Sequence, residues 1–158
     1  MKIDLAFQVN GRHRSISAAT NRTLAELLRE DLNLPGCRVA CDGEVCGSCT
    51  VIVDGQPTAA CSTFAFEVDG SQIETIEGLS SDGSLHPIQQ AFLEANAFQC
   101  GFCTAGLVMS VKALLAVHPQ PDDQTMLDWL KSNVCRCTGY QTILAATRLA
   151  AKRMASSE

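Results

Sequence analysis

This chain has little positive charge, few aromatic residues and no long apolar run. Its 158 residues include 12 Lys and Arg against 17 Asp and Glu, which gives a formal net charge of −5 at pH 7. Nucleic acids and anionic membranes bind basic patches, so this balance argues against both as partners. No apolar segment approaches the ~20 residues that a membrane-spanning helix needs. We therefore expect neither nucleic-acid binding nor a membrane span.

A secretory leader and low-complexity segments are also lacking. After a single Lys, the first residues alternate apolar and polar side chains, which is typical of a β-strand and not of a signal peptide. Hydrophobic residues make up 46% of the chain, enough to form a packed core. We expect a cytoplasmic protein; export together with a partner that carries a twin-arginine (Tat) signal is the alternative.

Cysteine is abundant, with nine copies in two groups. The odd count, the short gaps between cysteines and the lack of a leader argue against a disulfide framework and favour metal binding. The groups occupy positions 37, 41, 46, 49 and 61 and positions 100, 103, 135 and 137.

The first group begins with the string CRVACDGEVCGSC, residues 37–49. It contains C-x4-C-x2-C, and a more distant cysteine follows, which is the spacing of plant-type [2Fe–2S] ferredoxins. Glycines 36, 43 and 47 let the loop backbone approach the sulfurs and adopt positive φ where needed. A zinc site would more typically use two C-x2-C pairs. Cys37 is predicted to be a packed free thiol outside the site, and an alternative ligand or a redox-reactive thiol is the other interpretation. The predicted ligands are Cys41, Cys46, Cys49 and Cys61.

The second group combines a C-x2-C pair with a C-x-C pair, each beside the predicted start of a helix. Cys103 lies near a helix N-terminus, where unpaired N–H groups stabilise a thiolate. Four thiolates should meet at one end of the helices. On spacing alone, a structural zinc ion remains the alternative to a second iron–sulfur cluster.

The secondary-structure pattern divides where the cysteine groups divide. The first part alternates as strands around an Asn10-Gly11 turn, and a Thr23–Glu26 capping box begins its one helix. We predict an α+β protein with a strand-rich domain over residues 1–76, a polar linker over 77–85 and an all-α four-helix bundle over 86–158. Its four helices are predicted over residues 86–98, 104–117, 125–133 and 140–154.

Three strings, CDGEVCGSCTV, QCGFCTAGLVMS and NVCRCTGYQTI, together resemble the small iron–sulfur subunit of the xanthine dehydrogenase and aldehyde oxidase family of molybdenum hydroxylases. The similarity runs from about residue 3 to residue 152 and includes the order of the two domains. It implies a plant-ferredoxin-like β-grasp domain followed by the helical domain, with one [2Fe–2S] cluster in each. The ligands of the second cluster would be Cys100, Cys103, Cys135 and Cys137.

The resemblance also implies partners and an electron route. A large subunit would hold molybdopterin in a dinucleotide form, contacted by Gln99 and Cys137, and a medium subunit would hold FAD, in a dimer of heterotrimers. Electrons would pass from the molybdenum through the helical-domain cluster and then the ferredoxin-like cluster to FAD or another acceptor. No catalytic residue is expected in this chain, because it has no nucleophile–base pair.

Two positions depart from the family pattern: Ala105 replaces a usual proline, and Ser48 stands where alanine is common. Neither change removes a predicted ligand. Two other functions stay open on the sequence: a free-standing ferredoxin-like electron carrier and a zinc-stabilised interaction module.

Overall fold

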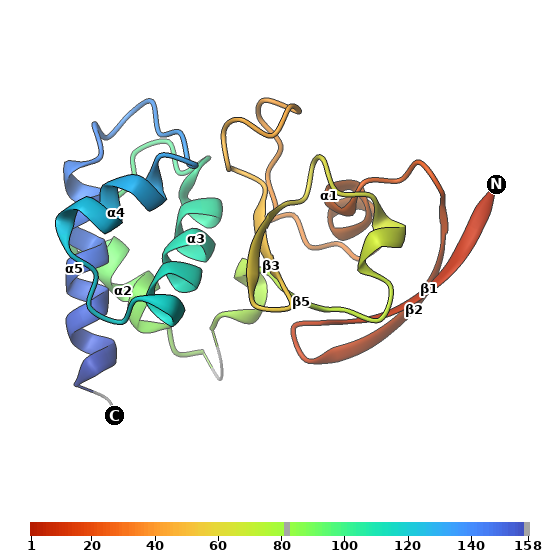
Figure 1. Ribbon diagram of the computed structural model, residues 1–158, viewed down its shortest axis with the longest axis horizontal. Helices are drawn as coiled ribbons and strands as arrows, with labels where there is room; N and C mark the ends of the chain where they lie inside the picture. The colour runs from red at the N-terminus through yellow and green to blue at the C-terminus, as the bar shows by residue number, and fades with distance from the viewer. Residues whose placement is uncertain (81–82, 157–158) are drawn as a thin grey trace.

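The computed structural model describes residues 1–80 and 83–156, and the two halves of the chain differ in secondary structure (Figure 1). The first half contains β1 Lys2–Val9, β2 Arg12–Ala19, α1 Leu24–Glu26, the π-helical turn η1 Leu27–Asp31, β3 Thr50–Val53, β4 Gln56–Ala59, the 3-10 turn η2 Ala65–Val68 and β5 Gln72–Glu74. After the 3-10 turn η3 Ile76–Gly78, the second half contains α2 Pro87–Glu94, α3 Thr104–Val117, α4 Asp123–Leu130 and α5 Gln141–Ala155.

The strands form one sheet in the order β2-β1-β5-β3-β4, in which only β1 and β5 are parallel. Two-residue turns close both hairpins. Asn10 and Gly11 have φ values of 50° and 74°, and Asp54 and Gly55 have 48° and 81°. Positive φ at both central residues is the requirement of a type I′ turn, so the predicted turn at Asn10-Gly11 is confirmed, and Asp54-Gly55 forms a second one.

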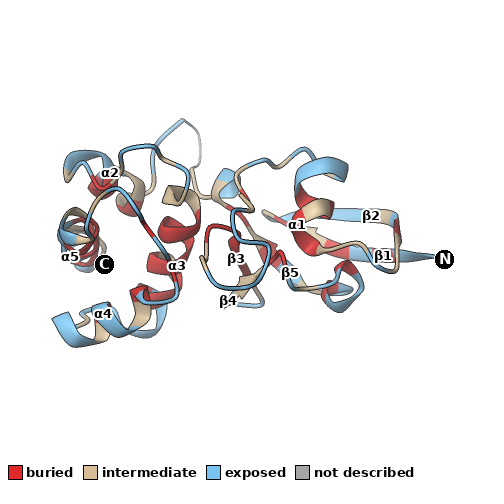
Figure 2. Cartoon of the chain, turned by 90° about the horizontal axis from the view of Figure 1, so that it is seen from above, coloured by how far each residue is buried: buried red, intermediate tan, exposed pale blue. Residues whose placement is uncertain are grey.

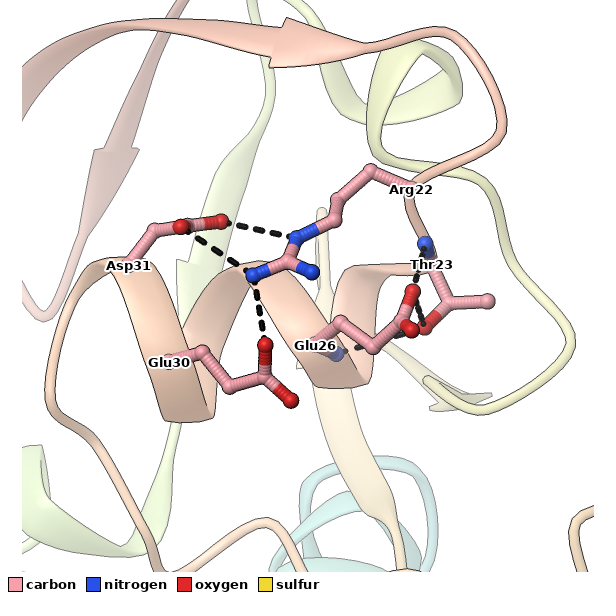
Figure 3. Close-up of polar contacts among 5 residues, drawn as sticks. All are labelled: Arg22, Thr23, Glu26, Glu30 and Asp31. Carbon is pink, nitrogen blue, oxygen red and sulfur yellow. Dashed lines mark hydrogen bonds and ion pairs between the residues drawn. The ribbon is translucent and has the colours of Figure 1, made fainter.

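The α1–η1 segment covers one face of the sheet. Leu24, Leu27 and Leu28 are fully buried in one core cluster, which also contains Leu5, Phe7 and Val9 of β1, Val51 of β3 and Ile73 of β5. The predicted capping box is present at the start of the segment, where the Thr23 hydroxyl accepts from the Glu26 N–H. At the other end, the Arg22 guanidinium donates to Asp31 and Glu30, which ties the last turn to the chain before the helix (Figure 3).

We expect Thr23→Ala to lower the free energy of unfolding by about 1 kcal/mol, because loss of an N-cap hydroxyl typically costs ~0.5–2 kcal/mol. Urea unfolding at pH 7 measures the effect. An equal stability of the variant and the natural chain would contradict a stabilising cap.

The same capping box predicts that the stability of the fold depends on pH. The Thr23 main-chain N–H and hydroxyl both donate to the Glu26 carboxylate, and they lower its pKa below the ordinary value of 4.5. A lowered folded-state pKa gives stability that is present above the unfolded pKa and is lost as the pH falls through the folded pKa. Glu26→Gln keeps a hydrogen-bonding side chain that does not titrate, so its stability should fall less on acidification. A pH profile identical to that of the natural chain would contradict this.

The second half packs its four helices around a separate core. Residues of α2, α3, α4 and α5, among them Phe92, Leu114 and Ile143, form this cluster. Two predicted helices have the wrong bounds. The helix predicted over 86–98 ends at Glu94, with Asn96 in a left-handed conformation at φ 49°, and the helix predicted over 125–133 runs from Asp123 to Leu130. Its actual start follows Asp122, whose carboxylate caps the Thr125 N–H.

Helix α3 joins the two halves, and it lies between the other helices and β3 (Figures 1 and 2). Nine residues of this helix are buried, on more than one face. Met109 and Ala113 contact Ile52 of β3 in a third apolar cluster, and Lys112 pairs with Glu74 of β5. A helix covered on both sides has no polar face, which explains its nearly continuous apolar sequence.

The predicted linker is only partly described, because residues 81 and 82 lie outside the described residues. Its beginning is packed, since Leu79 and the preceding Ile76 lie against the helical core. Among the described residues, no helix is both long enough and apolar enough to cross a membrane.

Candidate metal centres

The first four predicted ligands come together as two sulfur pairs. The side chains of Cys41 and Cys46 are neighbours, and both residues lie towards the surface. The side chains of Cys49 and Cys61 are also neighbours, and both residues are buried. One pair is therefore open to the surface and the other is covered by the first core.

Main-chain N–H groups surround the outer sulfur of this group. Val45 and Cys46 each donate to the Cys41 sulfur at 3.4 Å. Their hydrogen bonds, with that of the Gly43 N–H, lower the pKa of Cys41 to about 7. Asp42 and Glu44 have φ values of 50° and 59°. Backbone that alternates between right- and left-handed conformations turns successive N–H groups towards one anion, and these two residues provide such a turn.

In the inner pair, the pKa of Cys49 is shifted in the opposite direction to that of Cys41. Burial raises the pKa of Cys49 to about 11, and the neighbouring Cys61 thiol adds to the shift. A metal must therefore displace a proton from Cys49 when it binds, since thiolates are the ligands.

Cys37 lies behind this inner pair. It is 3% exposed, and its sulfur donates to the Cys49 carbonyl oxygen at 3.5 Å. Burial raises the pKa of Cys37 to about 12. Its packing is that of a small buried side chain, which supports the prediction of a free thiol.

The second four cysteines also form two pairs. The sulfurs of Cys100 and Cys137 are 3.6 Å apart, and both residues are exposed. The side chain of Cys103 neighbours that of Cys135, which is buried. As in the first group, one pair lies at the surface and the other lies towards the interior.

Cys103 is the N-cap residue of α3, at the predicted helix start, and the main-chain N–H there acts to lower the pKa of its thiol. Burial and the adjacent Cys135 raise the pKa of Cys103 to about 12. Desolvation outweighs the helix N-terminus here. At Cys135, burial acts to raise the pKa, but hydrogen bonds to the sulfur outweigh it and the pKa is lowered overall. The donors are the Thr138 hydroxyl, 3.1 Å away, and the N–H groups of Thr138 and Cys137.

The pairing of the sulfurs bears on which of two kinds of metal site these groups fit. A structural zinc needs four ligands that converge on one point, whereas a [2Fe–2S] cluster takes two ligands on each of two irons. Two pairs in each group therefore fit a two-iron cluster better than a zinc ion.

Gln99 lies beside the outer pair of the second group. Its side-chain Nε2 donates to the Cys137 carbonyl oxygen at 3.0 Å, and both residues are exposed. The structure thus brings together the two residues for which a pterin contact is predicted.

The loops of the two cysteine groups contact each other directly. The Val134 N–H donates to the Cys46 carbonyl oxygen at 2.8 Å, and the Asn133 side chain donates to the Gly47 carbonyl oxygen at 2.9 Å. Gly106 of α3 allows the close approach, because a Cβ there would lie 2.2 Å from the Gly47 oxygen. Val134 and Cys135 are adjacent, so ligand candidates from both groups are connected through one hydrogen bond.

The sequence reasoning missed Asn133 and Gly106. A glycine inside a helical pattern that is not a cap commonly marks close packing, and Gly106 gave this signal. Asn133 gave none, because its partner lies 86 positions away.

Comparisons with known proteins find iron–sulfur families over both parts of the chain. A family described as "2Fe-2S iron-sulfur cluster binding domain" matches residues 7–79, and one described as "[2Fe-2S] binding domain" matches residues 75–148. The chain is 45% identical to the nicotine 6-hydroxylase small subunit of Paenarthrobacter nicotinovorans, over 92% of this chain and 87% of that protein. It is 43% identical to one of the subunits of a probable xanthine dehydrogenase of Bacillus subtilis, over 86% of this chain and 78% of that protein.

A solved structure has the same fold. The quinoline 2-oxidoreductase of Pseudomonas putida 86 matches with a TM-score of 0.95 and 37% identity, over 99% of this chain and 98% of that chain. The mixed α/β architecture described above is therefore that of a known ferredoxin-like domain joined to a helical iron–sulfur domain.

Proposed function

This chain belongs to the small iron–sulfur subunits of the xanthine dehydrogenase and aldehyde oxidase family of molybdenum hydroxylases, and we propose how its residues serve that role. It is an electron-transfer subunit of a multi-subunit oxidoreductase and binds two [2Fe–2S] clusters. Each cluster, when bound, accepts and releases single electrons. The paired cysteines, joined through the Val134–Cys46 hydrogen bond, are the observation that supports the assignment best.

The ligand assignment follows the pairs. Cys41 and Cys46 would bind one iron of the first cluster, and Cys49 and Cys61 the other. In the second cluster the pairs would be Cys100 with Cys137 and Cys103 with Cys135. Inward-facing N–H groups at Cys41 would offset the negative charge of the first cluster and raise its potential.

Electrons would enter at the exposed end of the second group. There, Gln99 and Cys137 would contact the molybdopterin, in a dinucleotide form, on a large subunit. The Cys46–Val134 contact would then connect the second cluster to the first. From the first cluster, electrons would pass to FAD on a medium subunit or to another acceptor. The substrate pocket would lie on the large subunit.

Finer features of fold and assembly belong to the same proposal. The first part of the chain, residues 1–76, would be a β-grasp domain, and residues 86–158 a four-helix bundle. Two separate core clusters support this division. The complex would be a dimer of heterotrimers.

Isolation of the tagged full-length chain from its host tests the function. We expect a red-brown protein with iron for two clusters per chain, which copurifies with a molybdenum-containing partner. A colourless zinc protein would overturn the cluster assignment. An iron-loaded chain that is monomeric and has no molybdenum partner would instead show a free-standing electron carrier.

A further inference from the structure

Cluster binding does not account for Tyr140, the one tyrosine of the chain. It precedes α5 with φ 67°, a left-handed conformation that is unfavourable for a bulky side chain. Its hydroxyl donates to the Asn133 carbonyl oxygen at 3.0 Å and accepts from the Cys135 N–H at 2.9 Å. One side-chain group thus connects the residues on either side of Val134.

Asn133 extends this connection to the first cysteine group. It is 2% exposed, and its amide donates to the Gly47 carbonyl oxygen. The Ser132 hydroxyl, which donates to the Trp129 carbonyl oxygen at 2.9 Å, lies 3.1 Å from the Asn133 Oδ1. The Thr50 hydroxyl donates to the same Gly47 oxygen at 2.7 Å. The loop after Cys46 is therefore held from both sides.

Val134 itself has little to hold it in place. Its side chain is 45% exposed, so burial does not anchor this residue. Its N–H nevertheless makes the 2.8 Å hydrogen bond to the Cys46 oxygen. The position of this N–H is set by its two neighbours, which are fixed by the Tyr140 hydroxyl and by the Asn133 amide.

We propose that Tyr140 and Asn133 form a clamp that holds the Val134–Cys46 hydrogen bond and thereby sets the rate of electron transfer between the two clusters. Both are positioning residues, since neither is a predicted ligand. The inference rests on the proposed function. In the step concerned, one electron leaves the second cluster, which is oxidised, and enters the first, which is reduced; no bond breaks and no proton moves.

The test uses the full-length chain with both clusters loaded and the variants Tyr140→Phe and Asn133→Leu. Tyr140→Phe removes only the hydroxyl group, and Asn133→Leu removes the amide at nearly constant volume. Thr147→Val is the matched control, because it also removes a buried hydroxyl from the helical half, one that donates to Ile143 within α5. Iron content and thermal unfolding report whether each variant keeps its clusters and its fold.

Two further measurements address the clamp. Hydrogen exchange of the peptide that contains Val134 should be about tenfold faster in Tyr140→Phe, the factor that corresponds to ~1.4 kcal/mol, within the range for one lost hydrogen bond. After rapid one-electron reduction, redistribution of the electron between the clusters, followed by freeze-quench paramagnetic resonance, should be slower in both clamp variants than in Thr147→Val.

The outcomes separate the clamp from the proposed function. One outcome is that both clamp variants hold two clusters and still match Thr147→Val in the rate of hydrogen exchange at Val134 and in the rate of electron redistribution. In that case the clamp is overturned and the proposed function stands. If Tyr140→Phe slows electron redistribution at unchanged iron content, the clamp is supported even where Asn133→Leu fails to fold. If the natural chain holds no iron, the proposed function itself fails.

Discussion

Cys61→Ser is expected to remove one of the two clusters, while Cys37→Ser leaves both in place. The Cys61 thiol lies against Cys49 as one member of the buried pair, so its loss would leave one iron with a single cysteine ligand. Serine supplies a hard, protonated oxygen in place of a soft thiolate, and iron–sulfur clusters select thiolates. The iron content should fall by about half, with one paramagnetic signal lost on reduction.

Cys37→Ser is the matched control, because it makes the same atomic change at another buried position of the same group. Its hydroxyl can donate to the Cys49 carbonyl oxygen as the thiol does. The surviving signal of the second cluster in Cys61→Ser reports that the chain is still folded. If Cys37→Ser lost the cluster and Cys61→Ser kept it, the four cysteines of CRVACDGEVCGSC would be the site.

Gly106→Ala should disrupt the contact between the two halves. The added Cβ would lie 2.2 Å from the Gly47 oxygen and 2.9 Å from the Ser48 oxygen, both main-chain atoms that cannot rotate away. Overpacking of this kind typically costs ~1–3 kcal/mol, so the free energy of unfolding should fall by about 2 kcal/mol. The strained loop carries Cys46 and Cys49. We therefore expect iron retention during unfolding to fall together with the free energy of unfolding.

Gly43→Ala is the control for this prediction. A Cβ at Gly43 would meet no atom closer than the Cys41 oxygen at 3.7 Å, an ordinary contact. Chemical unfolding of both variants, followed by fluorescence of Trp129 and by the visible absorbance of the clusters, gives the comparison. Equal stability of Gly106→Ala and Gly43→Ala would mean that α3 does not press against the first cysteine loop.

Local features were predictable because their causes lie within a few residues. The type I′ turns at Asn10-Gly11 and Asp54-Gly55 follow from residues that tolerate positive φ, and the Thr23–Glu26 box follows from a three-residue spacing. One local expectation was too simple. Of the three glycines assigned to the first cysteine loop, only Gly47 has positive φ, and Asp42 and Glu44 adopt it instead.

The sequence by itself determined the composition of the two cysteine groups, the change from strands to helices and the family, since all three depend on residue types and their spacing. The tertiary structure decided how the sulfurs pair, which pair is buried, and that Val134 and Asn133 meet the loop after Cys46. These contacts join residues far apart in the chain. Their energy comes from burial and hydrogen bonding across an interface, for which no local pattern in the sequence gives a signal.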